Sequence, residues 1–168
     1  MILPINLNSW IDEHRHLLKP PVGNKVVYED TEFIIMIVGG PNTRKDYHVD
    51  KGEEFFYQIE GDMILRIIKN HKPKDIRINE GDIFLLPSNV PHSPQRFKDT
   101  VGLVVERKRN ENELDGFQWY CDNCNNLLYE KYIYLSDIES QLPPIFDSFW
   151  NNQSARTCKK CSHYLEKP

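Results

Sequence analysis

The cysteines are the first residues whose spacing suggests chemistry. All four lie in the last third of the 168-residue chain, as two tight pairs, Cys121-x-x-Cys124 and Cys158-x-x-Cys161. In a reducing compartment such pairs favour a metal site over disulfides, because a thiolate quartet satisfies a tetrahedral ion. Zinc and iron both accept four thiolates, so the spacing leaves the identity of this metal open.

Two segments, 40–61 and 81–96, loosely echo each other and carry a second group of reactive side chains. Arg44 and His48 are four residues apart, and so are His92 and Arg96. On extended strands residues four apart share a face, so each pair is expected to point the same way. The polar residues of the two segments that could serve a site are Arg44, His48, Asp50, Glu53, Glu54, His92 and Arg96.

A further carboxylate, Glu106, follows the apolar run 101–105. Buried charges are costly unless they are paired or functional. Two explanations stay open for Arg96 and Glu106: they pair with each other, or they serve a site. We interpret the following basic run, 107–109, as a solvated strand end.

The chain is long enough for one domain with a small appendage, since domains most often contain about 100–150 residues. At this size folding hides roughly 70% of the surface that the unfolded chain exposes, so neither disulfides nor a metal is needed to hold the main body together. Metal-binding residues are therefore free to serve chemistry.

Composition and charge exclude several classes of protein. The longest uncharged apolar run, 33–40, is too short to cross a membrane, and the N-terminus lacks the basic and apolar regions of a secretory signal. We therefore expect a soluble, cytoplasmic protein with no membrane partner. The 21 Lys and Arg against 25 Asp and Glu give a net charge of −4, which is the wrong sign for a general nucleic-acid binder. The expected partner is a small molecule.

Short β-prone runs fill the middle of the chain, from about residue 25 to 108. Gly, Pro, Asn and Asp separate them at nearly regular intervals, which is typical of an antiparallel sandwich or barrel. The predicted strands are 26–28, 33–38, 55–59, 63–68, 76–78, 83–86 and 101–105. Before them, Asn6 caps a short amphipathic helix that Pro20-Pro21 ends.

The C-terminal part has a different pattern. Residues 136–139 have the form of a capping box that opens a short helix, and Pro143-Pro144 ends that helix or starts another. The 33 residues that separate the cysteine pairs are many for a compact zinc finger. The thiolate site is therefore expected to fold a C-terminal segment back on itself.

The segments 40–61 and 81–96 resemble the two motifs of the cupin superfamily, which are small jelly-roll barrels that hold one metal inside. The resemblance implies a mainly β fold in which residues 1–110 form the catalytic barrel with its N-terminal helix. Residues 111–168 are expected to form an extension with short helices and the four-cysteine metal site, packed as part of one compact chain. The metal ligands of the cupin pattern correspond to His48, Glu54 and His92.

The first motif departs from the general cupin pattern, because its usual His-x-His is here His48-Val49-Asp50. A fourth ligand is therefore expected to be missing. Two imidazoles and one carboxylate form the facial triad of non-haem Fe(II) oxygenases, which leaves about three positions of an octahedron open. That number suits a chelating substrate together with O₂.

Glu53 is a rival to Glu54 as the carboxylate ligand. A shift of one residue along a strand turns the side chain to the opposite face, and only Glu54 has the matching distance, six intervening residues, to Gly61. We therefore choose Glu54. The histidines outside the two motifs are interpreted as structural or solvated: His14, His16, His71 and His163.

Further segments narrow the resemblance to the 3-hydroxyanthranilate 3,4-dioxygenase family. The match covers nearly the whole chain, including the cysteine quartet, and the combination is more specific than a single cupin motif, since that fold hosts many activities. The segments that carry it are Lys19-Pro-Pro-Val-Gly-Asn24, Met36-Ile-Val-Gly-Gly-Pro-Asn42, Glu54-Phe-Phe-Tyr-Gln58, Leu86-Pro-Ser-Asn-Val-Pro-His-Ser-Pro94 and Trp119-Tyr-Cys-Asp-Asn-Cys124.

This resemblance implies an enzyme that opens the ring of 3-hydroxyanthranilate with both atoms of O₂. Its product closes by itself to quinolinate, on the route from tryptophan to NAD. The resemblance assigns Fe(II) to His48, Glu54 and His92, O₂ contact to Arg44, and substrate contact to Glu54, Arg96 and Glu106, with Arg44 and Glu106 catalytic. The chemistry agrees, because a fixed guanidinium pairs a ring carboxylate and a carboxylate accepts a proton from a hydroxyl or amino group.

Several points stay open at this stage. The cysteine site takes a second iron or a zinc ion, and the resemblance allows either a monomer or a homodimer. A non-catalytic or isomerising metal cupin would give no reason for Arg44, Arg96 and Glu106 together. A zinc ribbon that binds nucleic acid conflicts with the acidic charge and with the wide separation of the cysteine pairs. A cupin oxygenase acting on another aromatic substrate is the remaining alternative.

Overall fold

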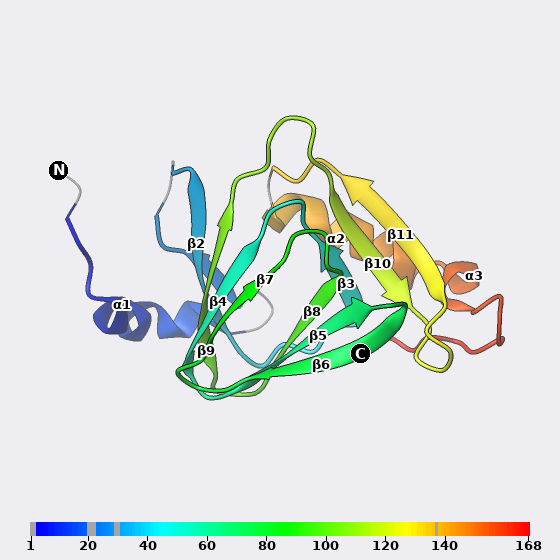
Figure 1. The fold of residues 1–168 in the computed structure, drawn as a ribbon, viewed down its shortest axis with the longest axis horizontal. Coiled ribbons are helices and arrows are strands. Elements are labelled where there is room, and N and C mark those ends of the chain that lie inside the picture. The colour runs from blue at the N-terminus through cyan, green and yellow to red at the C-terminus, as the bar shows by residue number, and fades with distance from the viewer. Residues whose placement is uncertain (1–2, 20–22, 29–30, 137) are drawn as a thin grey trace.

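The computed structural model describes residues 3–19, 23–28, 31–136 and 138–168. Within these ranges, two antiparallel sheets face each other and close into a barrel, as Figure 1 shows. The first sheet has the strand order β1-β2-β9-β4-β7, and the second has the order β11-β10-β3-β8-β5-β6. Neighbouring strands are often distant in the sequence, as in a jelly roll. The predicted fold class is confirmed.

The helices and strands have the following bounds. The strands are β1 Asn24–Val26, β2 Phe33–Gly39, β3 Asp46–Val49, β4 Glu54–Glu60, β5 Met63–Lys69, β6 Lys72–Ile78, β7 Ile83–Leu86, β8 His92–Arg96, β9 Val101–Arg107, β10 Asp115–Tyr120 and β11 Leu127–Ile133. The helices are α1 Leu7–His14, α2 Ile138–Trp150 and α3 Gln153–Arg156, and a 3-10 turn covers Arg15–Leu17.

Alternation along β4 and β9 places polar residues at both ends of the inner face and apolar ones between them. The two strands pair in register, so that Glu54 lies opposite Glu106 and Gln58 opposite Gly102. Between these pairs, Phe56 belongs to the apolar core that fills the space between the sheets. The barrel interior is therefore polar where the site lies and again near Gln58.

The N-terminal helix α1 packs on the outside of the first sheet. Asn6 caps it as predicted, with its side chain accepting from the Ser9 N–H. Ile11 and Leu18 bury Ile37 of β2 from the outer side. Pro20 and Pro21, which were predicted to end the helix, lie outside the described residues.

The C-terminal extension joins the second sheet, because β10 pairs with β3. Helix α2 lies against β10 and β11 (Figure 1), and Phe149 of that helix stacks on Trp119 with ring centroids 4.6 Å apart. The prediction that Pro143-Pro144 ends a helix or starts another is wrong, since α2 continues through both. Packing of its apolar face compensates for the backbone N–H groups that proline lacks.

The capping box predicted over 136–139 includes residue 137, which lies outside the described residues. No helix in the described ranges is long and apolar enough to cross a membrane.

Candidate active site

Two histidines and one glutamate meet inside the barrel. His48 of β3 pairs in register with His92 of β8. From β4 of the opposite sheet, Oε1 of Glu54 lies 3.4 Å from Nδ1 of His48 and 3.0 Å from Nε2 of His92. Glu53 is exposed. The structure thus brings together the three residues that the cupin motifs select.

Groups behind the two histidines fix which ring nitrogens face Glu54. Nδ1 of His92 lies 3.0 Å from the carbonyl oxygen of Val90, so Nδ1 donates and Nε2 presents its lone pair toward Glu54. Nε2 of His48 donates to Oδ2 of Asp115 at 2.7 Å, which leaves Nδ1 toward Glu54. Such outer partners orient metal-binding histidines and raise their basicity.

The electrostatics of the group favour a cation beside Glu54. Burial lowers the pKa of His48, but the hydrogen bond with Asp115 and the nearby Glu54 carboxylate outweigh burial and raise that pKa to about 10. Burial also raises the pKa of Glu54, but the nearby His92 and His48 side chains outweigh burial and hold that pKa well below its usual range. The carboxylates thus attract positive charge, which a metal ion would supply.

A divalent metal ion fits these residues. Oε1 of Glu54 is buried and accepts no hydrogen bond from the described residues. One ligand atom from each of His48, Glu54 and His92 lies within 4.8 Å of the other two. Two imidazole nitrogens with one carboxylate oxygen form the donor set of non-haem iron sites. Asp50 occupies the position of the second histidine in the His-x-His pattern of the first cupin motif. Its Oδ2 lies 3.1 Å from Nη2 of Arg109.

A cavity of about 770 Å³ opens over this group, and Arg96 lies in its wall. The Arg96 side chain is buried, and no carboxylate within the described ranges lies at ion-pair distance from it. Burial lowers its pKa to about 10. His92 and Arg96 both line the cavity, as their shared face of β8 predicts. A buried cation without an acid partner points to an anionic ligand.

Arg44 lines the same cavity but already has an acid partner. Its Nε and Nη2 atoms donate to the Asp46 carboxylate. Burial lowers the pKa of Arg44, but the Asp46 charge outweighs burial and raises it. Nη1 makes no hydrogen bond to the residues that the structure describes, so this nitrogen is the part of Arg44 left for a ligand.

Sequence reasoning missed Arg109. The interpretation of 107–109 as a solvated strand end is wrong at this residue, whose side chain is 4% exposed and donates to Oε1 of Glu106 at 2.5 Å. Glu106 therefore pairs with Arg109 and not with Arg96. Burial and the nearby Glu54 charge raise the pKa of Glu106, and Arg109 limits that rise.

Asp115, the first residue of β10, was also missed. It accepts from Nη2 of Arg109 at 2.7 Å and from His48 at 2.7 Å, and it is 1% exposed. Burial raises the pKa of Asp115, but the hydrogen bonds from His48 and Arg109 outweigh burial and lower it. One guanidinium thus holds both Glu106 and the carboxylate behind His48. The available signal was an Arg and an Asp placed on either side of the short turn 110–114.

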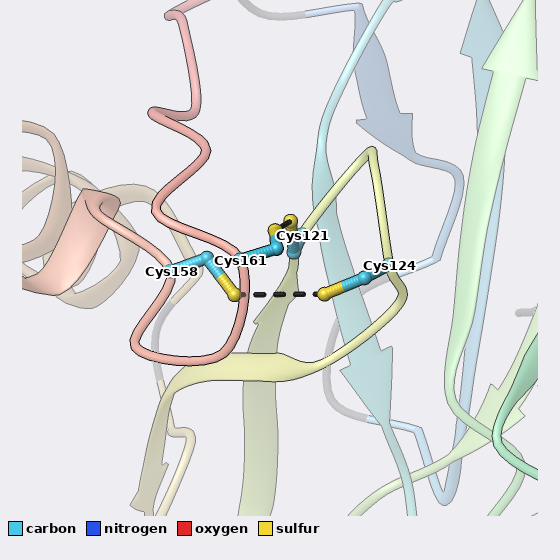
Figure 2. A group of neighbouring side chains, drawn as sticks. All are labelled: Cys121, Cys124, Cys158 and Cys161. Atoms are coloured by element: carbon cyan, nitrogen blue, oxygen red, sulfur yellow. Dashed lines mark hydrogen bonds between the residues drawn. The ribbon is translucent and has the colours of Figure 1, made fainter.

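The cysteines form a second group, away from the cavity. Figure 2 shows the pair from the β10–β11 turn facing the pair that follows α3. The Sγ atoms of Cys121 and Cys161 are 3.6 Å apart, as are those of Cys124 and Cys158. All four sulfur atoms lie within 4.8 Å of one another, and the cysteines are free thiols. Four thiolates at this separation suit zinc or iron.

Comparison with known proteins places this chain in a family. A family model described as 3-hydroxyanthranilic acid dioxygenase matches residues 1–150. The chain belongs to this family.

Individual relatives named 3-hydroxyanthranilate 3,4-dioxygenase match over nearly their full length. The protein from Xanthomonas euvesicatoria pv. vesicatoria (strain 85-10) is 54% identical over 168 residues, which cover 100% of this chain and 95% of that protein. The protein from Bacillus cereus (strain ATCC 10987 / NRS 248) is 50% identical over 161 residues, covering 95% of this chain and 90% of its own length.

Among solved structures, a cupin-2 domain containing protein from Shewanella frigidimarina is similar, with a TM-score of 0.49 and 18% identity over 62% of this chain and 94% of that chain. Membership of the 3-hydroxyanthranilic acid dioxygenase family confirms the resemblance found in the sequence. It also implies a metal cofactor, for which the His48, Glu54 and His92 group has the required donor atoms.

Proposed function

We propose that this chain is an Fe(II)-dependent dioxygenase that converts 3-hydroxyanthranilate and O₂ to 2-amino-3-carboxymuconate semialdehyde, which cyclises by itself to quinolinate. The observation that carries the proposal is a single cavity that holds both the His48, Glu54 and His92 group and the buried guanidinium of Arg96. A metal site alone needs no such cation, whereas an aromatic substrate with a carboxylate does. The family supports the reaction class.

His48, Glu54 and His92 would hold the iron. Bound Fe(II) would supply open coordination positions for the hydroxyl and amino groups of the substrate and for O₂. The protein contributes the orientation of its donor atoms, through the Val90 carbonyl behind His92 and the Asp115 carboxylate behind His48. Both supporting groups favour ring orientations that direct a nitrogen toward Glu54.

Arg96 would bind the ring carboxylate of the substrate. Apart from one Nη1 donor bonded to Gln58, its side-chain N–H groups have no hydrogen-bond acceptor among the described residues. A guanidinium presents parallel donors that match a carboxylate in two hydrogen bonds. Pairing with the substrate would supply the negative charge that this buried cation lacks, and it would fix the angle of the ring over the metal group.

Glu106 would accept a proton from the substrate as its hydroxyl or amino group becomes a ligand. Arg109 donates to Oε1 of Glu106, which leaves Oε2 as the atom to receive the proton. The raised pKa of Glu106, which burial causes, brings this carboxylate closer to the range in which a base is effective near neutral pH. Arg109 keeps the carboxylate from turning away from the cavity.

Arg44 would contact O₂ through Nη1. Asp46 holds the opposite edge of the guanidinium, so the side chain cannot swing freely into the substrate position. Apolar residues such as Met36, Phe56 and Val104 also line the cavity, and they limit the access of water to the reacting groups.

We further propose that the four cysteines bind one zinc or iron ion in a structural role, because the group lies outside both cupin motifs. The net charge of −4 argues against a nucleic-acid partner for this site. Residues 1–110 and 111–168 remain our proposed division into a catalytic barrel and an extension.

The test is reconstitution of metal-free protein. Fe(II) is added without air, followed by 3-hydroxyanthranilate and then O₂, while ultraviolet absorbance and oxygen uptake are recorded. We expect ring cleavage with one O₂ consumed per substrate, and no cleavage with the His92→Ala variant. Wild-type protein that takes up iron but leaves 3-hydroxyanthranilate intact would contradict the proposal, and so would a His92→Ala variant with normal turnover. Cleavage of a different aminophenol or catechol alone would point to another aromatic substrate.

A further inference from the structure

Two buried residues outside the proposed catalytic set, Gln58 and Gly102, lie next to the Arg96 guanidinium. The Arg96 side chain crosses from β8 to the opposite sheet, where Nη1 donates to Oε1 of Gln58 at 3.1 Å. Gln58 of β4 lies in register with Gly102 of β9, next to a register shift between Gln58 and Glu60. Gln58 is 1% exposed and Arg96 is 3% exposed, so this contact is shielded from water.

The orientation of the Gln58 amide follows from its two partners. Its Nε2 donates to the carbonyl oxygen of Glu60 at 3.1 Å. A carbonyl oxygen only accepts and a guanidinium only donates, so the amide oxygen must be the atom that faces Arg96. Gln58 therefore holds Arg96 with a fixed, uncharged acceptor.

Gly102 leaves the space that the guanidinium occupies. A Cβ atom at this position would lie 2.6 Å from Nη1 of Arg96 and 2.8 Å from Oε1 of Gln58. Both distances are shorter than real Cβ contacts, so any larger residue would displace the guanidinium or the amide. Main-chain hydrogen bonds to Asn42 in both directions fix the other end of Arg96, so the backbone could not follow such a shift.

We infer that Gln58 and Gly102 are positioning residues that aim Arg96 at the substrate carboxylate and restrict the enzyme to aromatic substrates that carry an acid group. A glutamate at position 58 would offer a charged acceptor in the same place and would pair with Arg96 permanently. The neutral amide holds the guanidinium without neutralising it, so the acid must come from the ligand. This inference rests on the proposed function.

The burial of Arg96 is consistent with this arrangement. Burial alone lowers its pKa, and no acid within the described ranges offsets that effect. A cation in this state gains more from a ligand carboxylate than an exposed arginine would.

The test compares 3-hydroxyanthranilate with 2-aminophenol, which keeps the chelating pair but lacks the carboxylate. Full-length, iron-loaded Gln58→Glu, Gln58→Leu and Gly102→Ala variants are assayed for KM and kcat with both compounds. For 3-hydroxyanthranilate, we expect kcat/KM to fall by at least about 30-fold in Gln58→Glu and by about 10-fold in the other two. For 2-aminophenol, we expect changes within about threefold. Gln153→Glu, on the exposed surface of α3, is the control for the added charge.

A double-mutant comparison separates positioning from general damage. In an Arg96→Ala background, Gln58→Leu should cause no further loss of discrimination between the two compounds, because it acts through Arg96. Circular dichroism and iron content show whether each variant is folded and loaded with iron. If a Gln58 variant fails to fold, Gly102→Ala still tests whether the position of the Arg96 guanidinium matters. Equal losses for both compounds, or the same Gln58→Leu effect without Arg96, would overturn the inference.

The outcome is distinguishable from failure of the proposed function. If the wild-type enzyme cleaves neither compound, the proposed function is wrong. If it cleaves 3-hydroxyanthranilate and the folded Gln58 and Gly102 variants discriminate as it does, only the positioning roles are wrong.

Discussion

Arg96 is the residue whose removal best separates an enzyme from a metal binder. Arg96→Ala should leave iron binding intact, because the side chain makes no hydrogen bond or ion pair with the three proposed ligands. It should weaken 3-hydroxyanthranilate binding by about 2–5 kcal/mol, or roughly 30-fold to several thousand-fold, with a lower kcat because a misplaced ring chelates poorly. Iron content and steady-state kinetics measure both effects. An equal loss with 2-aminophenol would mean that Arg96 serves the fold or the metal.

The Asp115 carboxylate is expected to support metal binding and not substrate binding. Asp115→Asn keeps an acceptor near His48 but removes the charge that Arg109 and His48 share. Losing such a supporting carboxylate typically lowers metal affinity by about 10–100-fold. Competition with a chelator for Fe(II) measures the loss, and Asp99→Asn, on an exposed turn, is the control. Unchanged iron affinity would show that Asp115 does not support the site.

Residues of the proposed site can be identified from the sequence when their spacing along a strand decides which way the side chain points. Glu54 could be chosen over Glu53 because a strand has a period of two, and this faces Glu54 inward. Arg109 and Asp115 could not be found in this way. Their burial depends on how the chain turns between β9 and β10. When the path of that turn is unknown, a run of three basic residues is interpreted as a solvated strand end.

At the scale of elements, the cysteines connect the β10–β11 turn to the segment after α3 (Figure 2). Cys124→Ser should therefore lose one metal equivalent per chain and lower Tm by at least about 5 °C, since each kcal/mol lost lowers Tm by roughly 2–4 °C at this size. Ring cleavage should remain measurable in the protein that stays folded. Metal analysis, thermal unfolding and activity are measured together. A folded variant with full iron in the barrel and no activity would contradict a structural role.

Elements were predictable from the sequence where apolar alternation is strong. The runs that became β2, β4, β5, β7 and β9 were placed within one or two residues of their ends. Strand β6 begins earlier than predicted, because its first residues are polar and lie at a sheet edge, where Pro73 is tolerated. Strands β3, β8, β10 and β11 were not among the predicted strands, although Phe117 and Trp119 of β10 alternate with polar residues. Helix α2 shows how tertiary packing overrides two prolines.

At the scale of the whole molecule, the outer face of the first sheet is apolar and only partly covered. Strand register aligns Leu85, Phe55, Val105 and Ile35 across β7, β4, β9 and β2, on the face opposite Glu54. Helix α1 covers the neighbouring Ile37, while Ile83 is 66% exposed and Leu85 is 53% exposed. An exposed apolar row that ends at the open edge strand β7 suits a contact with a second copy.

We therefore predict a homodimer through this face, with a mass of twice the 19.9 kDa chain. Leu85→Lys places a charge at the exposed β7 end of the aligned row, where a second copy would bury it without a partner, so this variant should be monomeric. Leu114→Lys, at an exposed leucine in the turn before β10, should leave the dimer intact. Light scattering after size-exclusion chromatography measures the mass at micromolar concentration. A monomeric wild type, or a dimer that tolerates Leu85→Lys, would show that this face does not join two copies. Because the cavity opens between the sheets and not on this face, a monomeric Leu85→Lys variant should keep its iron and its ring-cleaving activity.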